Sequence, residues 1–243
     1  MKEVLLQIQS NDALTESVYE MRLKGDVSNI TASGQFVNIK LEGLFLRRPI
    51  SVCDVENGVL TLLYKVVGKG TEQMAKMQAG ESLNVLVGLG NGYDLSLSGE
   101  APVLMGGGVG VPPMYMLAKQ LIKQGKKVTA ILGFNTQAEV FYEEEFKRLG
   151  ATVIVTTADG SYGQKGFVTD ALKSVDYTYF YTCGPEPMLK AVFKATNTSG
   201  QFSFEERMGC GFGACMGCSC KTVTGYKRIC KEGPVLQKEE ILW

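Results

Sequence analysis

Four of the seven cysteines in this 243-residue chain lie within residues 210–220, with glycines between them. Cys210, Cys215 and Cys218 have the spacing C-x4-C-x2-C, and Cys230 follows after eleven more residues. This is the ligand spacing of plant-type [2Fe–2S] clusters. Glycines suit such a site, because they let the backbone wrap tightly and aim N–H groups at negatively charged sulfur. Those in the segment are Gly209, Gly211, Gly213 and Gly217.

Two other uses of these thiols remain open from the spacing alone. A structural zinc site would also take four cysteines, although such sites usually contain two C-x2-C pairs and this segment contains one. Disulfides are the third use, and they are favoured in oxidising compartments. Cys220 is left over once four ligands are assigned. We expect it to be a neighbouring thiol that binds no metal.

A second group of candidate residues lies in the segments RRPIS, residues 47–51, and LYKVVGKGT, residues 63–71. Arg48 and Ser51 stand at a predicted strand end, and Gly70-Thr71 stands at a predicted helix start. The free N–H groups and positive dipole of a helix start attract phosphate. Each motif alone is equally an ordinary strand end or an ordinary helix cap. Together, in this order, they indicate a ligand that carries phosphate.

A third group is the glycine run GGGVGVPP, residues 106–113, between a predicted strand and a predicted helix. It is not the Rossmann fingerprint, because Val111 stands where a third glycine is required. The next strand also lacks the usual acidic residue at its end, which reads Gly133-Phe134-Asn135. Cys183-Gly184-Pro185 ends a later strand. There it would lie beside the glycine run, in the crevice at the carboxyl edge of the sheet. The run could equally be a plain strand–helix turn, and Cys183 a buried small residue.

The composition narrows the chemistry that these groups can perform. The chain has no histidine, which excludes Ser-His-Asp and Cys-His catalysis and a Rieske cluster. Difficult chemistry must therefore come from a bound cofactor or a partner chain. Lysine plus arginine equals aspartate plus glutamate, 25 each, so no overall field favours nucleic acid or an anionic membrane. The N-terminal MKEVLLQIQSND predicts no signal peptide, and we expect a cytoplasmic protein with reduced thiols.

Three modules are predicted to position these groups, in a multi-domain α+β fold. Residues 1–98 contain short, partly alternating strands, which predict an antiparallel β-barrel. Residues 99–200 alternate strands with helices and predict a central parallel α/β sheet, with EVFYEEEFKRLG (139–150) as one solvated helix. Residues 201–243 are rich in cysteine and glycine and predict a small cluster module.

The motifs together resemble the ferredoxin reductase superfamily. R-x-x-S at residues 48–51, G-x-G-T at residues 68–71, GGGVGVPP and CGPEPM carry the resemblance, which spans nearly the whole chain. FEERMGCGFGACMGCSC narrows it to the electron-transfer subunits of dihydroorotate dehydrogenase B. The resemblance implies an oxidoreductase subunit that binds FAD in the barrel, NAD in the α/β domain and a [2Fe–2S] cluster in the C-terminal module.

The resemblance also implies which residues hold each group, and it implies no catalytic residue in this chain. For FAD they are Arg48, Pro49, Ile50, Ser51, Leu63, Tyr64 and Lys65, with Gly70 and Thr71 at the pyrophosphate. For NAD they are Gly106, Gly107, Gly108, Gly110, Cys183, Gly184 and Pro185. For iron they are Cys210, Cys215, Cys218 and Cys230.

A partner chain follows from the resemblance as well. It is an FMN-containing dihydroorotate dehydrogenase catalytic subunit, in a heterotetramer with two of each subunit, acting in pyrimidine biosynthesis. Electrons would pass from that FMN through the cluster and FAD to NAD+. We expect NAD rather than NADP, because acidic residues and no arginine cluster follow the strand that ends at Asn135. These acids are Glu139, Glu143, Glu144 and Glu145.

Two other functions compete with this interpretation. Related subunits serve hydrogenases and NADH-dependent ferredoxin:NADP oxidoreductase complexes, with the same cofactors and another partner. A zinc-stabilised module that binds a protein and catalyses nothing is the alternative of a different class.

Overall fold

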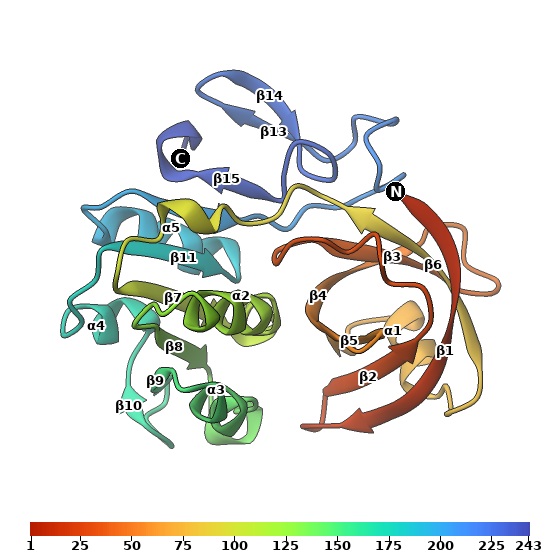
Figure 1. Cartoon of the computed structure of the whole chain (residues 1–243), viewed down its shortest axis with the longest axis horizontal. Helices are drawn as coiled ribbons and strands as arrows, with labels where there is room; N and C mark the ends of the chain where they lie inside the picture. Colours follow the sequence, from red (N-terminus) through yellow and green to blue (C-terminus); the bar gives the residue numbers. More distant parts are fainter.

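The N-terminal region forms a closed antiparallel barrel in the computed structural model, which describes all 243 residues (Figure 1). The strands follow the order β1-β2-β5-β4-β3-β6 around the barrel. Their bounds are Lys2–Ala13 (β1), Val18–Lys24 (β2), Phe36–Lys40 (β3), Arg48–Glu56 (β4), Val59–Lys65 (β5) and Ser82–Leu89 (β6). Helix α1, Lys69–Ala75, lies in the connection from β5 to β6. The predicted barrel is confirmed.

Alternating polarity determines which side chains fill the barrel. Along β1, Val4, Leu6 and Ile8 are buried, whereas Leu5 between them is exposed. Successive strand residues point to opposite faces, so one face of each strand supplies the barrel core. Met74 of α1 is fully buried in the same core.

The central region is a seven-stranded sheet of order β10-β9-β8-β7-β11-β12-β15, parallel except for β15. The bounds are Pro102–Gly107 (β7), Thr129–Phe134 (β8), Thr152–Thr157 (β9), Gln164–Lys165 (β10), Tyr179–Cys183 (β11), Gly200–Ser203 (β12) and Val235–Gln237 (β15). The helices are Pro112–Lys123 (α2), Glu143–Leu149 (α3), Val168–Leu172 (α4) and Glu186–Ala195 (α5). This is the predicted parallel α/β sheet. None of the helices is both long and apolar enough to cross a bilayer.

Helices cover both faces of this sheet. Leu104 of β7 packs in a core with α2 and α3, whereas Val103 and Met105 pack with α4 and α5. Because neighbouring residues of a strand point in opposite directions, the two cores lie on opposite faces. The strands are therefore apolar on both sides, which is why they read as continuous hydrophobic runs.

The cluster module is a long connection between two neighbouring strands of the sheet. Ser203 of β12 and Val235 of β15 are paired, and residues 204–234 form the connection that joins them along the chain. This connection contains the two-stranded hairpin of β13, Ser219–Thr222, and β14, Gly225–Arg228 (Figure 1). The predicted boundary between the second and third modules, at residue 201, falls inside β12. After the cluster module, β15 brings the chain back into the central sheet.

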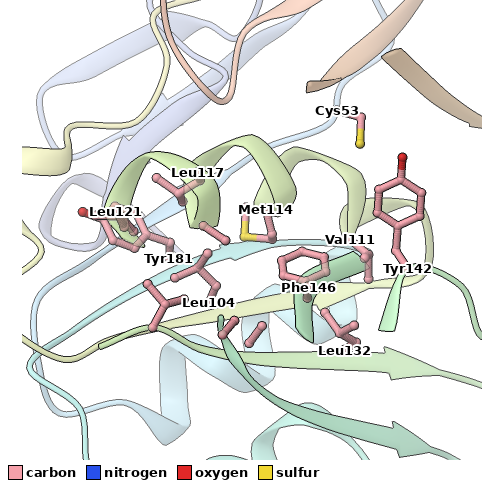
Figure 2. Close-up of a cluster of buried hydrophobic side chains, with 14 of the residues drawn as sticks. Cys53, Leu104, Val111, Met114, Leu117, Leu121, Leu132, Tyr142, Phe146 and Tyr181 are labelled. Carbon is pink, nitrogen blue, oxygen red and sulfur yellow. The ribbon is translucent and has the colours of Figure 1, made fainter. Parts of the chain in front are cut away.

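An interdomain seam, formed by Glu20, Cys53, Asp54, Lys119 and Tyr142, joins the barrel to the sheet. Tyr142 donates a hydrogen bond to Glu20 Oε2 at 2.6 Å, and Lys119 Nζ lies 2.8 Å from Asp54 Oδ2. Cys53 and Tyr142 lie opposite each other at the edge of the core beneath α2 (Figure 2). The seam fixes the barrel against α2 and the segment that precedes α3.

The predicted helix over residues 139–150 is shorter in the structure, and the difference shapes the seam. A 3-10 turn covers Gln137–Glu139, and α3 begins only at Glu143. Tyr142 has a φ of 66°, in the left-handed region that residues other than glycine seldom adopt. This backbone conformation turns the Tyr142 ring into the core, where it meets Tyr115 with ring centres 5.2 Å apart.

Candidate functional site

The four predicted iron ligands form two pairs of sulfurs. Cys210 N lies 3.5 Å from Cys215 Sγ, and Cys230 N lies 3.4 Å from Cys218 Sγ, so Cys210 is beside Cys215 and Cys230 is beside Cys218. All seven cysteines are free, so the disulfide alternative gains no support. No three cysteine, aspartate or glutamate side chains are grouped closely enough to hold one metal ion.

Pairing in twos suits a two-iron cluster better than a single zinc ion. In a [2Fe–2S] cluster each iron takes two protein ligands, whereas structural zinc takes four around one centre. Backbone N–H groups already point at the sulfurs. Ala214 N lies 3.2 Å and Cys215 N 3.4 Å from Cys210 Sγ, and Cys230 N lies 3.4 Å from Cys218 Sγ. Such donors stabilise thiolate ligands and bridging sulfide.

The same donors act on the protonation of Cys210. Burial alone would raise the pKa of its thiol, but the N–H groups of Phe212, Cys215 and Ala214, together with the Cys215 side chain, outweigh burial and lower that pKa to about 6. A metal ligand must be deprotonated, so this environment favours the form that binds iron.

The two pairs differ in burial. Cys218 and Cys230 are each 2% exposed and belong to the core under α4 and α5. Cys210 is partly exposed and Cys215 exposed, on a loop without regular secondary structure. One pair is therefore held by the sheet domain and the other by the loop alone.

Glycine is required at two positions of this loop. Gly211 and Gly213 have φ values of 78° and 91°. A Cβ at Gly211 would overlap the Asn38 amide, and one at Gly213 would lie 2.6 Å from Lys231 Cδ. Arg228 braces the same turn by donating to the Gly213 carbonyl at 2.6 Å.

Cys220 lies apart from the four sulfurs. It lines a cavity of about 280 Å³ between α5, Phe204 and the C-terminal Trp243, which none of the predicted ligands reaches. Burial, followed by the charges of Glu206 and Glu186, raises the pKa of this thiol. A protonated thiol that faces a different cavity agrees with our expectation that Cys220 binds no metal.

The residues predicted for FAD lie at the start of β4, the end of β5 and the first turn of α1. Arg48 has no acidic partner, and its guanidinium fills the space that a Cβ at Gly70 would need. The Ser51 side chain is partly exposed. An unpaired cation beside a helix start fits a ligand that carries phosphate.

Three of the residues predicted for FAD have structural contacts within the protein. The Thr71 hydroxyl accepts hydrogen bonds from Val67 N at 2.9 Å and Gly68 N at 3.3 Å, so it caps α1. Tyr64 is 1% exposed and donates to Asn11 inside the barrel. Leu63 points the other way, into the core shared with the sheet domain. Tyr64 could therefore meet a ligand only through its backbone.

The glycine run and the Cys183 segment meet at the carboxyl edge of the sheet. Cys183 pairs with Gly106 across β11 and β7, and a Cβ at Gly110 would overlap the Cys183 carbonyl. The space beside Gly108 is open, and its φ is 52°. A turn with no side chains at the crevice of a parallel sheet suits the close approach of a dinucleotide.

Cys183 is neutral at physiological pH. Burial, followed by the charge of Glu205, raises the pKa of its thiol to about 12. It is partly exposed at the end of β11, beside Gly184. A neutral, small side chain at this edge leaves the crevice open without adding charge.

Two residues with structural roles were missed from the sequence. Tyr142 was assigned to a solvated helix but lies in the seam, and its bulky aromatic type between Phe141 and three glutamates was the only available signal. Glu139 was assigned to the same helix but turns back to the end of β8. Neither placement follows from spacing.

Comparison with known families identifies two regions of the chain. Residues 205–242 match the family described as the iron–sulfur cluster binding domain of dihydroorotate dehydrogenase B. Residues 104–194 match the oxidoreductase NAD-binding domain. Both regions agree with the modules predicted from the motifs.

Individual proteins are similar over nearly the full length. The dihydroorotate dehydrogenase B (NAD(+)) electron transfer subunit of Fusobacterium nucleatum is 45% identical over 96% of both chains. A chain of the NADH-dependent reduced ferredoxin-NADP oxidoreductase structure superposes with a TM-score of 0.89, at 30% identity over 99% of this chain and 90% of that one. A ferredoxin NADP+ reductase from Neisseria gonorrhoeae with bound FAD and NADP has a TM-score of 0.71 at 19% identity, covering 80% and 90%, and shares the fold.

Proposed function

Because this chain belongs to the family of dihydroorotate dehydrogenase B electron-transfer subunits, we propose that it passes electrons from a catalytic partner to NAD+. The partner carries FMN and oxidises dihydroorotate to orotate in pyrimidine biosynthesis, in a complex of two subunits of each kind. Seven free cysteines suit the reducing cytoplasm, where we place this complex.

The observation that carries the proposal is that the four cysteines lie in two pairs on a chain whose glycine turn and Cys183 meet at the carboxyl edge of the sheet. When bound, FAD supplies the exchange between hydride transfer and single-electron transfer, and the cluster supplies a single-electron path. The flavin alone can exchange single electrons for hydride, and the cluster extends the one-electron path from the flavin toward the partner.

The residues of this chain bind and orient these groups. The Arg48 guanidinium neutralises phosphate beside Gly70, and Ser51 offers a hydroxyl on the same strand. The open glycine turn admits the dinucleotide next to Cys183. The absence of histidine leaves no obvious general base for C–H cleavage, which agrees with substrate oxidation on the partner.

Replacing single cysteines tests the proposal. The complex, prepared without oxygen, should contain iron rather than zinc, and its visible absorption should fall with dithionite. Cys215→Ser should lose iron and abolish electron passage from dihydroorotate to NAD+, because one of four ligands is removed. Oxidation of NADH by a two-electron acceptor should remain, since it needs only the flavin.

Cys220→Ser is the matched control, because this cysteine lies in the same module and faces another cavity. It should retain iron and full electron passage. Zinc in the purified protein, or passage unaffected by Cys215→Ser, would contradict the proposal.

The 30% identical oxidoreductase chain supports a second candidate, the same type of subunit with another partner. The dihydroorotate assignment is favoured by the higher identity of 45%. Copurification separates the two. An FMN protein of about 30 kDa, the size of one TIM barrel, supports the first, and a large multi-cluster partner supports the second.

A further inference from the structure

Strand β3 is paired with the strand segment that is predicted to hold FAD. Residues 36–39 of β3 lie opposite residues 48–51 of β4, with Phe36 facing Ser51 and Ile39 facing Arg48. Neighbouring strands of a sheet lie about 4.8 Å apart. A ligand held by residues 48–51 would therefore lie close to β3.

The outer face of β3 meets the cluster module. Val37 and Ile39 fill the barrel core, so Phe36 and Asn38, which alternate with them, point out of the barrel. Phe36 packs in the same core as the buried pair of cysteines. β3 lies on the side of the barrel that faces the cluster module (Figure 1). This one strand thus touches both the predicted flavin segment and the cluster module.

Asn38 makes the corresponding contact with the loop that carries the exposed pair of cysteines. Its Nδ2 donates a hydrogen bond to the Cys210 carbonyl at 3.4 Å, between residues 172 positions apart in the chain. The same amide packs against Gly211, where a Cβ would come within 2.3 Å of Asn38 Nδ2. Asn38 therefore ties a predicted iron ligand to the strand beside the predicted flavin segment.

The Asn38 amide occupies this position at a cost in stability. The residue is 1% exposed, and its Oδ1 has no hydrogen-bond partner. A buried polar atom without a partner destabilises a protein, and an apolar side chain of similar shape would avoid that loss. The amide therefore points to a role for its donor end, which is the end that meets Cys210.

We propose that Asn38 is a positioning residue, which fixes the Cys210 loop against β3 and so keeps the cluster at a set place relative to FAD. The inference rests on the proposed function, because it concerns the passage of electrons between these two groups. It assigns to the barrel a residue that acts on the cluster through the backbone of one ligand.

Asn38→Leu in the whole complex tests this role, because leucine has a similar size and no donor. Iron and FAD should be bound in wild-type amounts. The electron paramagnetic resonance spectrum of the reduced cluster should change, since the Cys210 loop is no longer fixed. Electron passage from dihydroorotate to NAD+ should fall about threefold to tenfold, the effect of one lost hydrogen bond. Oxidation of NADH by a two-electron acceptor should be unchanged, because it needs only the flavin.

Asn38→Asp is a second variant, which keeps the shape of the side chain and places an oxygen where the donor was. It should change the spectrum as well and slow electron passage further, because a carboxylate oxygen repels the Cys210 carbonyl. Loss of iron from both variants would show that Asn38 is needed to assemble the cluster rather than to position it, and would overturn the inference.

Asn84→Leu is the matched control. Asn84 lies on β6, the other neighbour of β3, and its Oδ1 is also buried without a partner. Its Nδ2 donates to Glu3 at 2.9 Å and not to the cluster loop, so this variant should keep the wild-type spectrum and rate.

An unchanged spectrum or an unchanged rate in Asn38→Leu, or the same changes in Asn84→Leu, would overturn the inference alone. A wild-type complex without iron would overturn the proposed function as well.

Discussion

The interdomain seam and the cluster loop are held by different forces. The seam combines a closely packed core with a hydrogen bond from Tyr142 to Glu20 and an ion pair of Lys119 with Asp54. The loop over residues 207–217 has no regular secondary structure and an exposed ligand, Cys215. Many of its hydrogen bonds end on sulfur.

This difference indicates what each region needs in order to stay folded. The seam is satisfied by contacts within the protein, so it should persist without any cofactor. The loop directs N–H groups at sulfurs that must share negative charge, so iron and sulfide complete its bonding. Stability in the first region is a property of the chain, and in the second a property of the chain with its metal.

Removing the iron should produce the largest difference in hydrogen exchange between the cluster loop and the seam. In the apo complex, amides over residues 207–217 should exchange with solvent more than about a hundredfold faster, because local opening then costs little free energy. Amides of α2 and β4 in the seam should keep their protection. Hydrogen exchange read by mass spectrometry measures both regions at once. Equal loss of protection in both would show that the seam also depends on the cofactor.

Tyr142→Phe should have an intermediate effect and sharpen the description of the seam. Loss of the hydroxyl removes the hydrogen bond to the Glu20 carboxylate and should lower the free energy of unfolding by about 1–2 kcal/mol in urea titrations. The iron content should not change, because the loop lies elsewhere.

Tyr115→Phe is the control for this substitution. Its ring lies against that of Tyr142, with centres 5.2 Å apart, but no hydrogen bond to its hydroxyl contributes to its raised pKa. If Tyr115→Phe lowered the free energy of unfolding as much as Tyr142→Phe does, the hydrogen bond to Glu20 would not explain the effect of Tyr142→Phe.

Lys119→Met should have the smallest effect. The ion pair with Asp54 is partly solvated, with the two side chains 31% and 13% exposed, so its loss should cost less than about 1 kcal/mol. The cost should shrink further in high salt, because solvent ions screen exposed charges. A cost above that of Tyr142→Phe would reverse the ranking of the two contacts. Lys173→Met, at an exposed pair on α4, serves as the reference near zero.

Short-range patterns were sufficient to predict most of the architecture. Alternation along β1 and β2 predicted barrel strands, and continuous apolar runs predicted the parallel sheet. The cysteine spacing brought four cysteines forward as iron ligands, and this stays a prediction; the structure places them in two pairs, an arrangement that suits a two-iron cluster. These features depend on residues that are close in sequence.

Features that depend on distant residues could not be predicted. Tyr142 leaves its expected helix because its hydroxyl finds Glu20, 122 residues away. Glu139 was counted as an acid downstream of Asn135 and placed in a solvated helix, because the 3-10 turn that reverses the chain there has no spacing signature. The Thr71 hydroxyl illustrates the opposite case, since the cap expected from local sequence is present while its role toward FAD stays a prediction.

Because Ser203 is paired with Val235, the whole iron-binding segment, residues 204–234, is one insertion between two adjacent strands. Its two ends leave and rejoin the molecule at the same place. A short turn spliced between these residues would delete the metal centre while preserving the order of every other strand. Such a segment could be gained or lost in one genetic event. Its gain would convert a flavin reductase without a cluster into one with a cluster, and its loss would do the reverse.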